Sequence, residues 1–402
     1  MRLSKHHPPQ HEEVVDRRQV NDAKDISITA NFARFNACNT VFARAQWDER
    51  IRSKKAIDYF KSMIGYPPYI KRTDGYTQKD FALRNAGWTV ANLAIERNLH
   101  KNRHDGFLDD IEAYRPPYHE KVEVASTEEM SLEIKKVAKL FGADLCGIAK
   151  LDMRWHYTHK FDAVNCEEKA VSFPEGLTSC IVFAAAMPYD IIKTYPSALA
   201  GFGPGMSYSK ETFIVQGVAQ FIRNMGYAAV ASLNDTANSI PYAIQAGLGE
   251  YARNGLVITK EYGPRVRFGM IFTDLPLSFD QPIQFGVKQF CNTCNLCATN
   301  CPAKAIPFGV PSSEVYNVSN ISGVEKWTVD GEKCFKVWVN QGTECGICVR
   351  VCPYNLDRDN FKHRLFRKIL LKNPFKKSTL TLYAFLQLNK RMSPKHWWKT
   401  KR

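Results

Sequence analysis

Just after residue 125, the apolar residues are spaced as on one face of a helix. Ser126-Thr127-Glu128-Glu129 has the Ser-x-x-Glu spacing of a capping box, in which side chains satisfy the free N–H groups of a helix start. The apolar residues that follow recur every three or four positions, as on one face of a helix: Met130, Ile134, Val137 and Leu140. The pattern therefore predicts a helix that begins next to Ser126.

Short continuous apolar runs come next, and they predict strands that are covered on both faces. These runs lie at 145–149, 179–187 and 228–233, and a further strand is expected at 265–272. Helical stretches are expected near 209–225 and 241–253. Strands interspersed with helices indicate the α/β (α+β) class.

Turn residues and composition divide the chain further. Residues 1–25 are polar and predict a loosely ordered arm, and 26–125 are expected to pack on the α/β domain at 126–282. A cysteine-rich module is expected at 283–356 and a basic tail at 357–402.

The chain shows no stretch that predicts a membrane span. No window approaches the roughly 18 uninterrupted apolar residues that a spanning helix needs. Arg17-Arg18 is a twin arginine, but polar residues follow it where an export signal needs an apolar region. We expect a cytoplasmic protein from the sequence as written. The alternative is a membrane-associated protein that is exported as a longer precursor.

Charge is concentrated at the C-terminal end. The chain carries a formal charge of +15, and 353–402 hold 14 Lys and Arg against 2 Asp and Glu, which is +12. Such a tail is compatible with an anionic membrane surface, an acidic protein partner or nucleic acid. A solvated end segment that packs its apolar residues on the body explains it equally well. Those apolar residues are Leu365, Phe366, Ile369, Leu370, Phe375, Trp397 and Trp398.

Eight of the twelve cysteines lie between Cys291 and Cys352, in two runs that end in Cys-Pro. The first run has the Cys-x2-Cys-x2-Cys-x3-Cys-Pro spacing of bacterial ferredoxins, in which the fourth cysteine ligates the other cluster. The sequence therefore predicts two [4Fe-4S] clusters. The ligands of cluster 1 are expected to be Cys291, Cys294, Cys297 and Cys352. Those of cluster 2 are expected to be Cys301, Cys334, Cys345 and Cys348.

Structural zinc and disulfides explain these cysteines less well. Three thiols in successive Cys-x2-Cys steps crowd one tetrahedral ion, and disulfides do not account for the Cys-Pro endings. The other four cysteines are scattered: Cys38, Cys146, Cys166 and Cys180. Cys146 and Cys180 stand in apolar stretches, where a cysteine usually behaves as a small buried hydrophobe.

The central segment resembles the catalytic subunit of corrinoid reductive dehalogenases, from about residue 30 to 356. The resemblance is carried by several short motifs together with the cysteine runs. They are Ser207-Tyr208-Ser209, Gly226-Tyr227-Ala228, Asn234-Asp235-Thr236, 240–250, Arg253-Asn254-Gly255, 261–267 and 273–277.

This resemblance implies a nitroreductase-like domain followed by a ferredoxin-like module. It implies base-off cobalamin without a histidine ligand, reduced to Co(I) by the nearer cluster. The histidine-ligating Asp-x-His-x-x-Gly signature is indeed absent from the chain. The implied reaction replaces a carbon–halogen bond of an organohalide by carbon–hydrogen. The implied partners are an electron donor protein or a quinol-linked system, and a membrane-anchor protein; no nucleic acid is expected.

The resemblance also assigns candidate site residues. Tyr208 matches the proton donor, Asn234 a neighbouring polar contact, and Arg267 a cation expected to make the Tyr208 phenol a better acid. The segment at Gly247, Leu248 and Gly249 is expected to contact the cofactor. Trp327 and Trp338 are candidates for the pocket wall on other grounds, because they are aromatic and lie between the two cysteine runs. Without the resemblance, Tyr208 would be a helix-start residue, Asn234 a turn residue and Arg267 a strand residue facing water.

Two other functions are weighed against this one. Epoxyqueuosine reductases share the corrinoid domain and paired clusters but act on a transfer RNA base. Their usual motifs are replaced here by Asn238-Ser239-Ile240-Pro241 and Ala252-Arg253-Asn254-Gly255. The other alternative is a non-catalytic iron–sulfur electron carrier, which would bind no corrinoid.

Overall fold

The computed structural model describes residues 26–62, 67, 69–100, 120–162, 167–372 and 377–400. The predicted arm at 1–25, together with Cys166 and Phe375, lies outside these residues.

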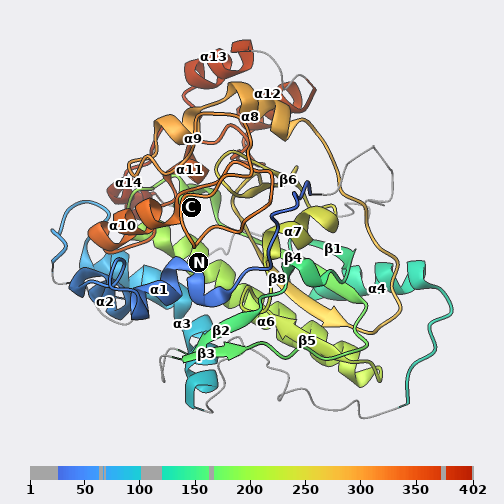
Figure 1. The fold of residues 1–402 in the computed structure, drawn as a ribbon. Coiled ribbons are helices and arrows are strands. Elements are labelled where there is room, and N and C mark those ends of the chain that lie inside the picture. The colour runs from blue at the N-terminus through green and yellow to red at the C-terminus, as the bar shows by residue number, and fades with distance from the viewer. Residues whose placement is uncertain are drawn as a thin grey trace.

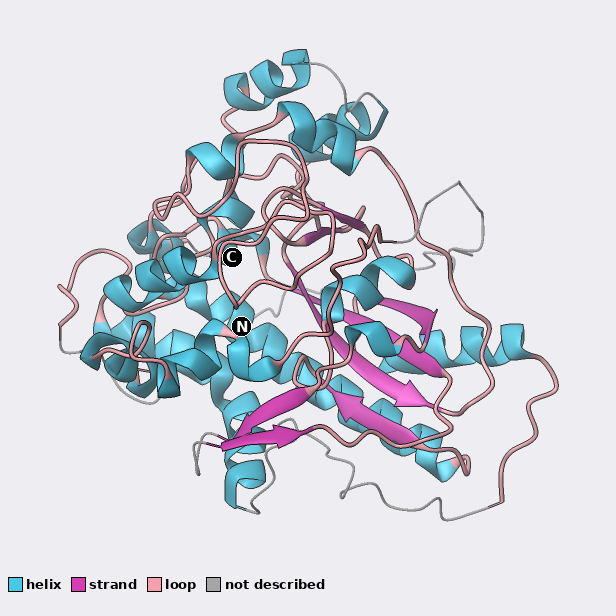
Figure 2. Ribbon diagram, viewed as in Figure 1, coloured by secondary structure: helices cyan, strands magenta, loops and turns pink. Residues whose placement is uncertain are grey.

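A four-stranded sheet lies at the centre of the α/β domain (Figures 1 and 2). Its order is β1 (Leu145–Lys150), β4 (Ser179–Ala186), β8 (Val266–Thr273) and β5 (Ala229–Ser232), and all neighbours are antiparallel. The four predicted strands are confirmed to within one residue at each end. The antiparallel sheet with separate helices gives an α+β architecture, as expected.

The strands are continuously apolar because each face of the sheet has its own core. In β4, Ile181 and Phe183 point into a core shared with α4 (Thr127–Leu140) and α6 (Phe202–Asn224). Cys180, Val182 and Ala184 point into a second core that contains residues of α7 (Ser239–Gln245). Alternate side chains of a strand point to opposite faces, so covering both faces requires an unbroken apolar run. Cys146 and Cys180 are buried, as predicted.

The helix predicted after Ser126 is α4, and its capping is confirmed. The Ser126 hydroxyl accepts a hydrogen bond from the Glu129 N–H at 3.2 Å. This bond satisfies one of the four N–H groups that lack a partner at a helix start.

Helix α6 begins at Phe202, earlier than the predicted 209. Gly203-Pro204-Gly205 resembles a break in sequence, but proline is tolerated in a first helical turn, where its missing N–H needs no partner. Gly205 is required by packing, because a Cβ there would lie 2.4 Å from Trp88 Cδ1 of α3 (Gln78–His100). Tyr208 therefore lies inside α6. The alternative interpretation of Tyr208 as a helix-start residue is wrong.

Helix α7 ends at Gln245, earlier than the predicted 253. Gly247 adopts a positive φ of 67°, which favours glycine and ends a helix. A Cβ at Gly247 would lie 2.5 Å from the Gln281 carbonyl oxygen, and one at Gly249 would lie 2.1 Å from that of Ile258. The chain continues into a small hairpin of β6 (Glu250–Tyr251) and β7 (Val257–Ile258).

The described helices of the cysteine-rich module are α8 (Val287–Thr293), α9 (Leu296–Thr299), α10 (Gly331–Gln341) and α11 (Ile347–Arg350). In the view of Figure 1, α8, α9 and α11 lie above the sheet, and α10 lies at the left beside α1 and α2. The N-terminal region contacts both domains. Helices α1 (Val41–Trp47) and α2 (Lys54–Lys61) share a small core with α10, whereas α3 packs along α6. The remaining short elements are η1 (Ala37–Asn39), η3 (Met153–Trp155), β2 (His159–Asp162), β3 (Glu167–Ala170), α5 (Tyr189–Ile192) and η4 (Leu199–Gly201).

The basic tail forms helices α12 (Phe361–Lys372), α13 (Lys377–Phe385) and α14 (Pro394–Lys399). Phe366 and Tyr383 join a core with residues of the cysteine-rich module. The indole N–H groups of Trp397 and Trp398 donate to Asp190 and Asp80, so both tryptophans are fixed to the body of the protein. Among the described helices, none is long and apolar enough to cross a membrane.

Candidate active site

Three elements bring Tyr208, Asn234 and Arg267 together. Tyr208 comes from α6, Asn234 from the loop after β5, and Arg267 from the start of β8. The Tyr208 hydroxyl donates to Asn234 Oδ1 at 2.9 Å. The Arg267 guanidinium lies over the Tyr208 ring, 3.6 Å from its centroid, in a cation–π contact. The three predicted residues thus form one cluster, although their chemical roles stay predictions.

Arg267 acts on the Tyr208 phenol in the expected direction, but burial has the larger effect on its pKa. Burial raises the pKa of Tyr208 to about 12 and outweighs Arg267, which acts in the expected direction and lowers it. Desolvation prevails because the phenolate would lose much of its hydration among the packed side chains of this half-buried position. The phenol therefore stays neutral, with its proton in place, throughout the physiological pH range.

Two further residues complete this cluster, and the sequence did not single them out. The Trp88 ring of α3 lies 5.0 Å from the Tyr208 ring, centroid to centroid. Glu211 lies one turn after Tyr208 on α6, and its Oε2 is 3.9 Å from Arg267 Nε. The three-residue spacing that places Glu211 on the Tyr208 face was the available signal.

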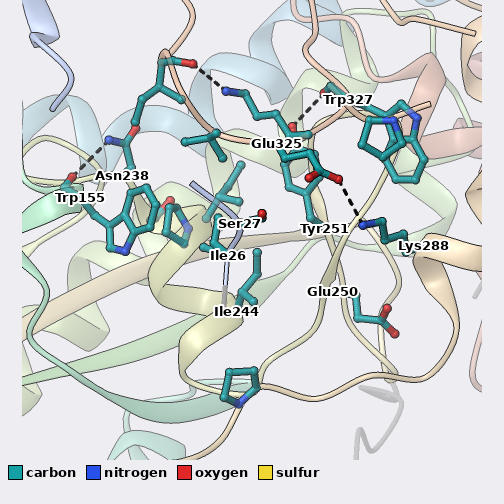
Figure 3. A pocket seen from close by; sticks show the side chains of 18 of the residues that line it. Ile26, Ser27, Trp155, Asn238, Ile244, Glu250, Tyr251, Lys288, Glu325 and Trp327 are labelled. Carbon is teal, nitrogen blue, oxygen red and sulfur yellow. Dashed lines mark hydrogen bonds and ion pairs between the residues drawn. The ribbon is translucent and has the colours of Figure 1, made fainter. Parts of the chain in front are cut away.

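A cavity of about 740 Å³ lies between the sheet domain and the cysteine-rich module (Figure 3). Its wall combines isoleucines with tryptophans and a few polar groups. The lining residues are Ile26, Ser27, Trp155, Tyr157, Asn234, Asn238, Ser239, Ile240, Pro241, Ile244, Glu250, Tyr251, 282–284, Lys288, Gln289, Pro311, Ile321 and 324–327. Asn234 therefore belongs both to this wall and to the Tyr208 cluster. The Tyr157 hydroxyl donates to the Asn234 carbonyl oxygen at 3.1 Å and fixes that loop.

Charged groups line the side of the cavity nearest the cysteine-rich module. Lys288 and Glu325 form an ion pair at 3.6 Å (Figure 3). The Lys326 ammonium donates to the Ile321 carbonyl oxygen at 2.8 Å. Burial lowers the pKa of Lys326 to about 8.

Of the residues that the sequence placed at the pocket or cofactor, Trp327 lines the cavity, whereas Trp338 and Leu248 do not. Trp327 lines the cavity, and its carbonyl oxygen accepts from the Tyr251 hydroxyl at 3.0 Å. Trp338 does not line it; its ring packs 5.9 Å from that of Phe42, centroid to centroid. Leu248 is fully buried in the second core, away from the cavity wall. The glycines on either side of it fit close backbone packing, so the structure gives this segment a structural role.

The eight cysteines of the two runs fall into two groups. Burial raises the pKa of Cys352, and the nearby thiols of Cys291, Cys294 and Cys297 raise it further. Burial likewise raises the pKa of Cys348, and Cys334, Cys345, Cys297 and Cys301 raise it further. Cys334 is affected in turn by Cys345 and Cys301, and Cys345 by Cys301, which places these four in the second group. No three His, Cys, Asp or Glu side chains in the described part of the chain are placed to hold one metal ion. The grouping therefore rests on these mutual interactions, and it is the one that the crossed ligand assignment requires.

Buried thiols of raised pKa need positive charge nearby to become thiolates, and the iron of a cluster supplies it. The residues present therefore fit two clusters, while the individual ligand assignments stay predictions.

Arg253 connects the first cysteine group to the cavity wall. Its guanidinium donates to the Cys291 carbonyl oxygen at 2.7 and 3.0 Å, and lies 5.0 Å from the Trp327 ring centroid. Helix α8 makes a second connection, because it carries both Lys288 of the cavity wall and Cys291. The group of Cys291 is therefore adjacent to the cavity.

Fold and site together define an iron–sulfur redox protein in which a double cluster module adjoins a ligand cavity. Residues 290–355 match the family model of the 4Fe-4S double cluster binding domain. The chain is 37% identical to a tetrachloroethene reductive dehalogenase of Desulfitobacterium hafniense over 271 residues, covering 57% of this chain and 49% of that protein. It is 35% identical to a tetrachloroethene reductive dehalogenase of Sulfurospirillum multivorans over 265 residues, covering 60% and 52%.

A solved reductive dehalogenase, whose structure suggests a mechanism for B12-dependent dehalogenation, covers 93% of this chain with a TM-score of 0.70 and 24% identity. The match covers 49% of that protein and establishes the fold. The chain is thus similar in sequence to the reductive dehalogenases, and the resemblance found in its motifs is confirmed. It spans about half the length of the curated relatives it matches.

Proposed function

We propose that the chain catalyses the reductive dehalogenation of an organohalide, with cobalamin in the cavity and two [4Fe-4S] clusters as the electron path. The cavity is of a size for a large ligand, since its volume of about 740 Å³ lies high in the usual range of ligand pockets, and the apolar side chains of its wall suit an organohalide. When bound, the cobalamin would supply the electrons that cleave the carbon–halogen bond.

The observation that carries this proposal is the position of Asn234. This residue lines the cavity and accepts the Tyr208 hydrogen bond, so the proton donor lies next to the ligand space. We assign to Tyr208 the protonation of the carbon that loses its halogen. Arg267, stacked on the ring, stabilises the phenolate that forms and the departing halide.

The electrons would enter through cluster 2 and leave through cluster 1. This direction follows from the place of the Cys291 group beside the cavity, which leaves the Cys348 group as the outer one. An electron donor protein or a quinol-linked system would reduce cluster 2.

We further propose that the tail contacts an anionic membrane surface or a membrane-anchor protein. Helix α12 exposes Phe361 and Leu365 among Lys362, Arg364 and Lys368, which are also exposed. Apolar and basic side chains on one exposed helix are the combination that binds an anionic interface.

The activity is tested with protein reconstituted anaerobically with iron, sulfide and cobalamin. Chlorinated and brominated aryl and alkenyl compounds are supplied with reduced viologen, and halide release is measured. We expect release well above that of the same concentration of free cobalamin. Protein with full cofactor occupancy that releases no more halide than free cobalamin, across the panel, contradicts the proposal.

A further inference from the structure

Glu211 is a buried carboxyl group that the proposed chemistry does not yet use. It lies on α6, its side chain is 0% exposed, and neither carboxyl oxygen has a hydrogen-bond partner among the described residues. An ionised carboxylate in such a place loses its hydration without compensation, whereas the protonated acid loses far less.

The charged groups that face Glu211 come from three places. Arg267 approaches from β8, with Nε at 3.9 Å from Oε2, too far for a hydrogen bond. Asp235 acts from the loop after β5, and Lys210 from α6 itself. Arg267 Nε is also without a hydrogen-bond partner in the part of the chain that the structure describes. The carboxyl and the guanidinium are therefore within ion-pair distance but not hydrogen-bonded to each other.

We propose that Glu211 is a positioning residue that controls Arg267: as a neutral acid it leaves the guanidinium to the active site, and as a carboxylate it draws the guanidinium away. This inference rests on the proposed function. In that reaction the carbon takes two electrons from the reduced cofactors and the proton of Tyr208, and the halogen leaves as halide. A phenolate and a halide then appear beside Arg267, so a third anion at Glu211 would compete with both for one cation.

The electrostatics of the site agree with this geometry. Burial raises the pKa of Glu211 to about 8 and outweighs the lowering effect of Arg267 and Lys210, while Asp235 raises it further. Glu211 is thus neutral at pH 7 and ionises at mildly alkaline pH. Tyr208 keeps its proton over the same interval, because its pKa is about 12.

The test is the pH dependence of kcat for halide release by the loaded enzyme and three variants. The native enzyme should lose activity about tenfold between about pH 7 and pH 9, the fall expected when one group ionises near pH 8. Glu211→Gln cannot ionise, so its kcat should change less than about twofold over that interval. Glu211→Asp keeps an ionisable group and should retain an alkaline decline. Glu133→Gln, on the exposed side of α4, is the matched control and should behave as the native enzyme.

Two results would overturn the inference. An alkaline decline that persists unchanged in Glu211→Gln assigns the pH dependence to another group. Glu211→Gln that is inactive at every pH, with full cofactor occupancy, shows that the carboxyl group itself is required, which a residue that acts only by leaving Arg267 free does not allow.

A second readout does not depend on activity. Infrared difference spectra between about pH 7 and pH 9 should show a protonated-carboxyl band in the native protein that is lost at high pH and is absent in Glu211→Gln. Its absence from native protein also contradicts the inference. If the native enzyme releases no halide at any pH but shows this band, the proposed function fails and the protonation state of Glu211 stands.

Discussion

The substitution Tyr208→Phe tests the proton donor with the least structural disturbance. It removes one oxygen atom and keeps the ring. The ring centroid lies 5.0 Å from that of Trp88 and 3.6 Å from the Arg267 guanidinium, and both contacts should persist. The hydrogen bond from Tyr208 to Asn234 Oδ1 is lost. Cobalamin and cluster occupancy should stay normal, because the cysteines and the cavity wall are unchanged.

The expected magnitude follows from the role and the burial of the hydroxyl. Loss of a positioned acid lowers kcat by about 10²-fold or more. An unpaired Asn234 acceptor costs about 1–3 kcal/mol of folding stability at most. The native Tyr208 has a pKa raised above its ordinary value of 10 to about 12, so its contribution to stability is present below pH 10 and is lost as pH rises towards 12. Tyr208→Phe should lack this alkaline loss.

The assay is halide release at saturating organohalide, with the absorption spectrum as a check on the cofactors. Tyr227→Phe is the matched control, because Tyr227 is a buried tyrosine whose hydroxyl donates to the Val122 carbonyl oxygen at 2.7 Å, outside the cavity wall. Near-native turnover of Tyr208→Phe with full occupancy would refute the assignment, since the proton would then come from elsewhere.

Three further predictions concern other parts of the molecule. Arg267→Lys keeps the charge but loses the planar group that stacks on Tyr208, so kcat should fall about tenfold or more while cobalamin occupancy is retained; an unchanged kcat contradicts the role of the guanidinium. Cys334→Ser should reduce the iron content from about eight to about four per chain and remove one of two redox transitions. Cys180→Ala, in a strand outside the module, should leave both intact. Lys362→Glu combined with Lys368→Glu should abolish binding to anionic vesicles at low salt, and undiminished binding argues against α12 as the contact.

The sequence predicted those parts of the fold that depend on local pattern. The strands were recognised because both faces are covered, which leaves an unbroken apolar run such as that of β4. The cysteine spacing predicted the double cluster module because it is also a local pattern, in which the ligands within each loop are close in sequence. The motifs at Tyr208, Asn234 and Arg267 located residues that the structure brings into contact.

The features that sequence missed depend on residues far away in the chain. The glycine at position 205 of α6 is explained by Trp88, which occupies the space beside it and lies on another helix. The raised pKa of Tyr208 results from burial, which a motif does not reveal. Glu211 looks like an ordinary helical residue until the strand that carries Arg267 is placed beside it. Trp338 lies on α10, whose position places it against Phe42 and away from the cavity wall.

The most direct test of the central claim is turnover of an organohalide in D2O by the fully loaded protein, with halide and product measured together. We predict one halide released per product molecule, and one deuterium on the carbon that carried the halogen, because the proton of Tyr208 exchanges with solvent. Halide and product at no more than the level of free cobalamin, from protein that holds both clusters and cobalamin, would contradict the account.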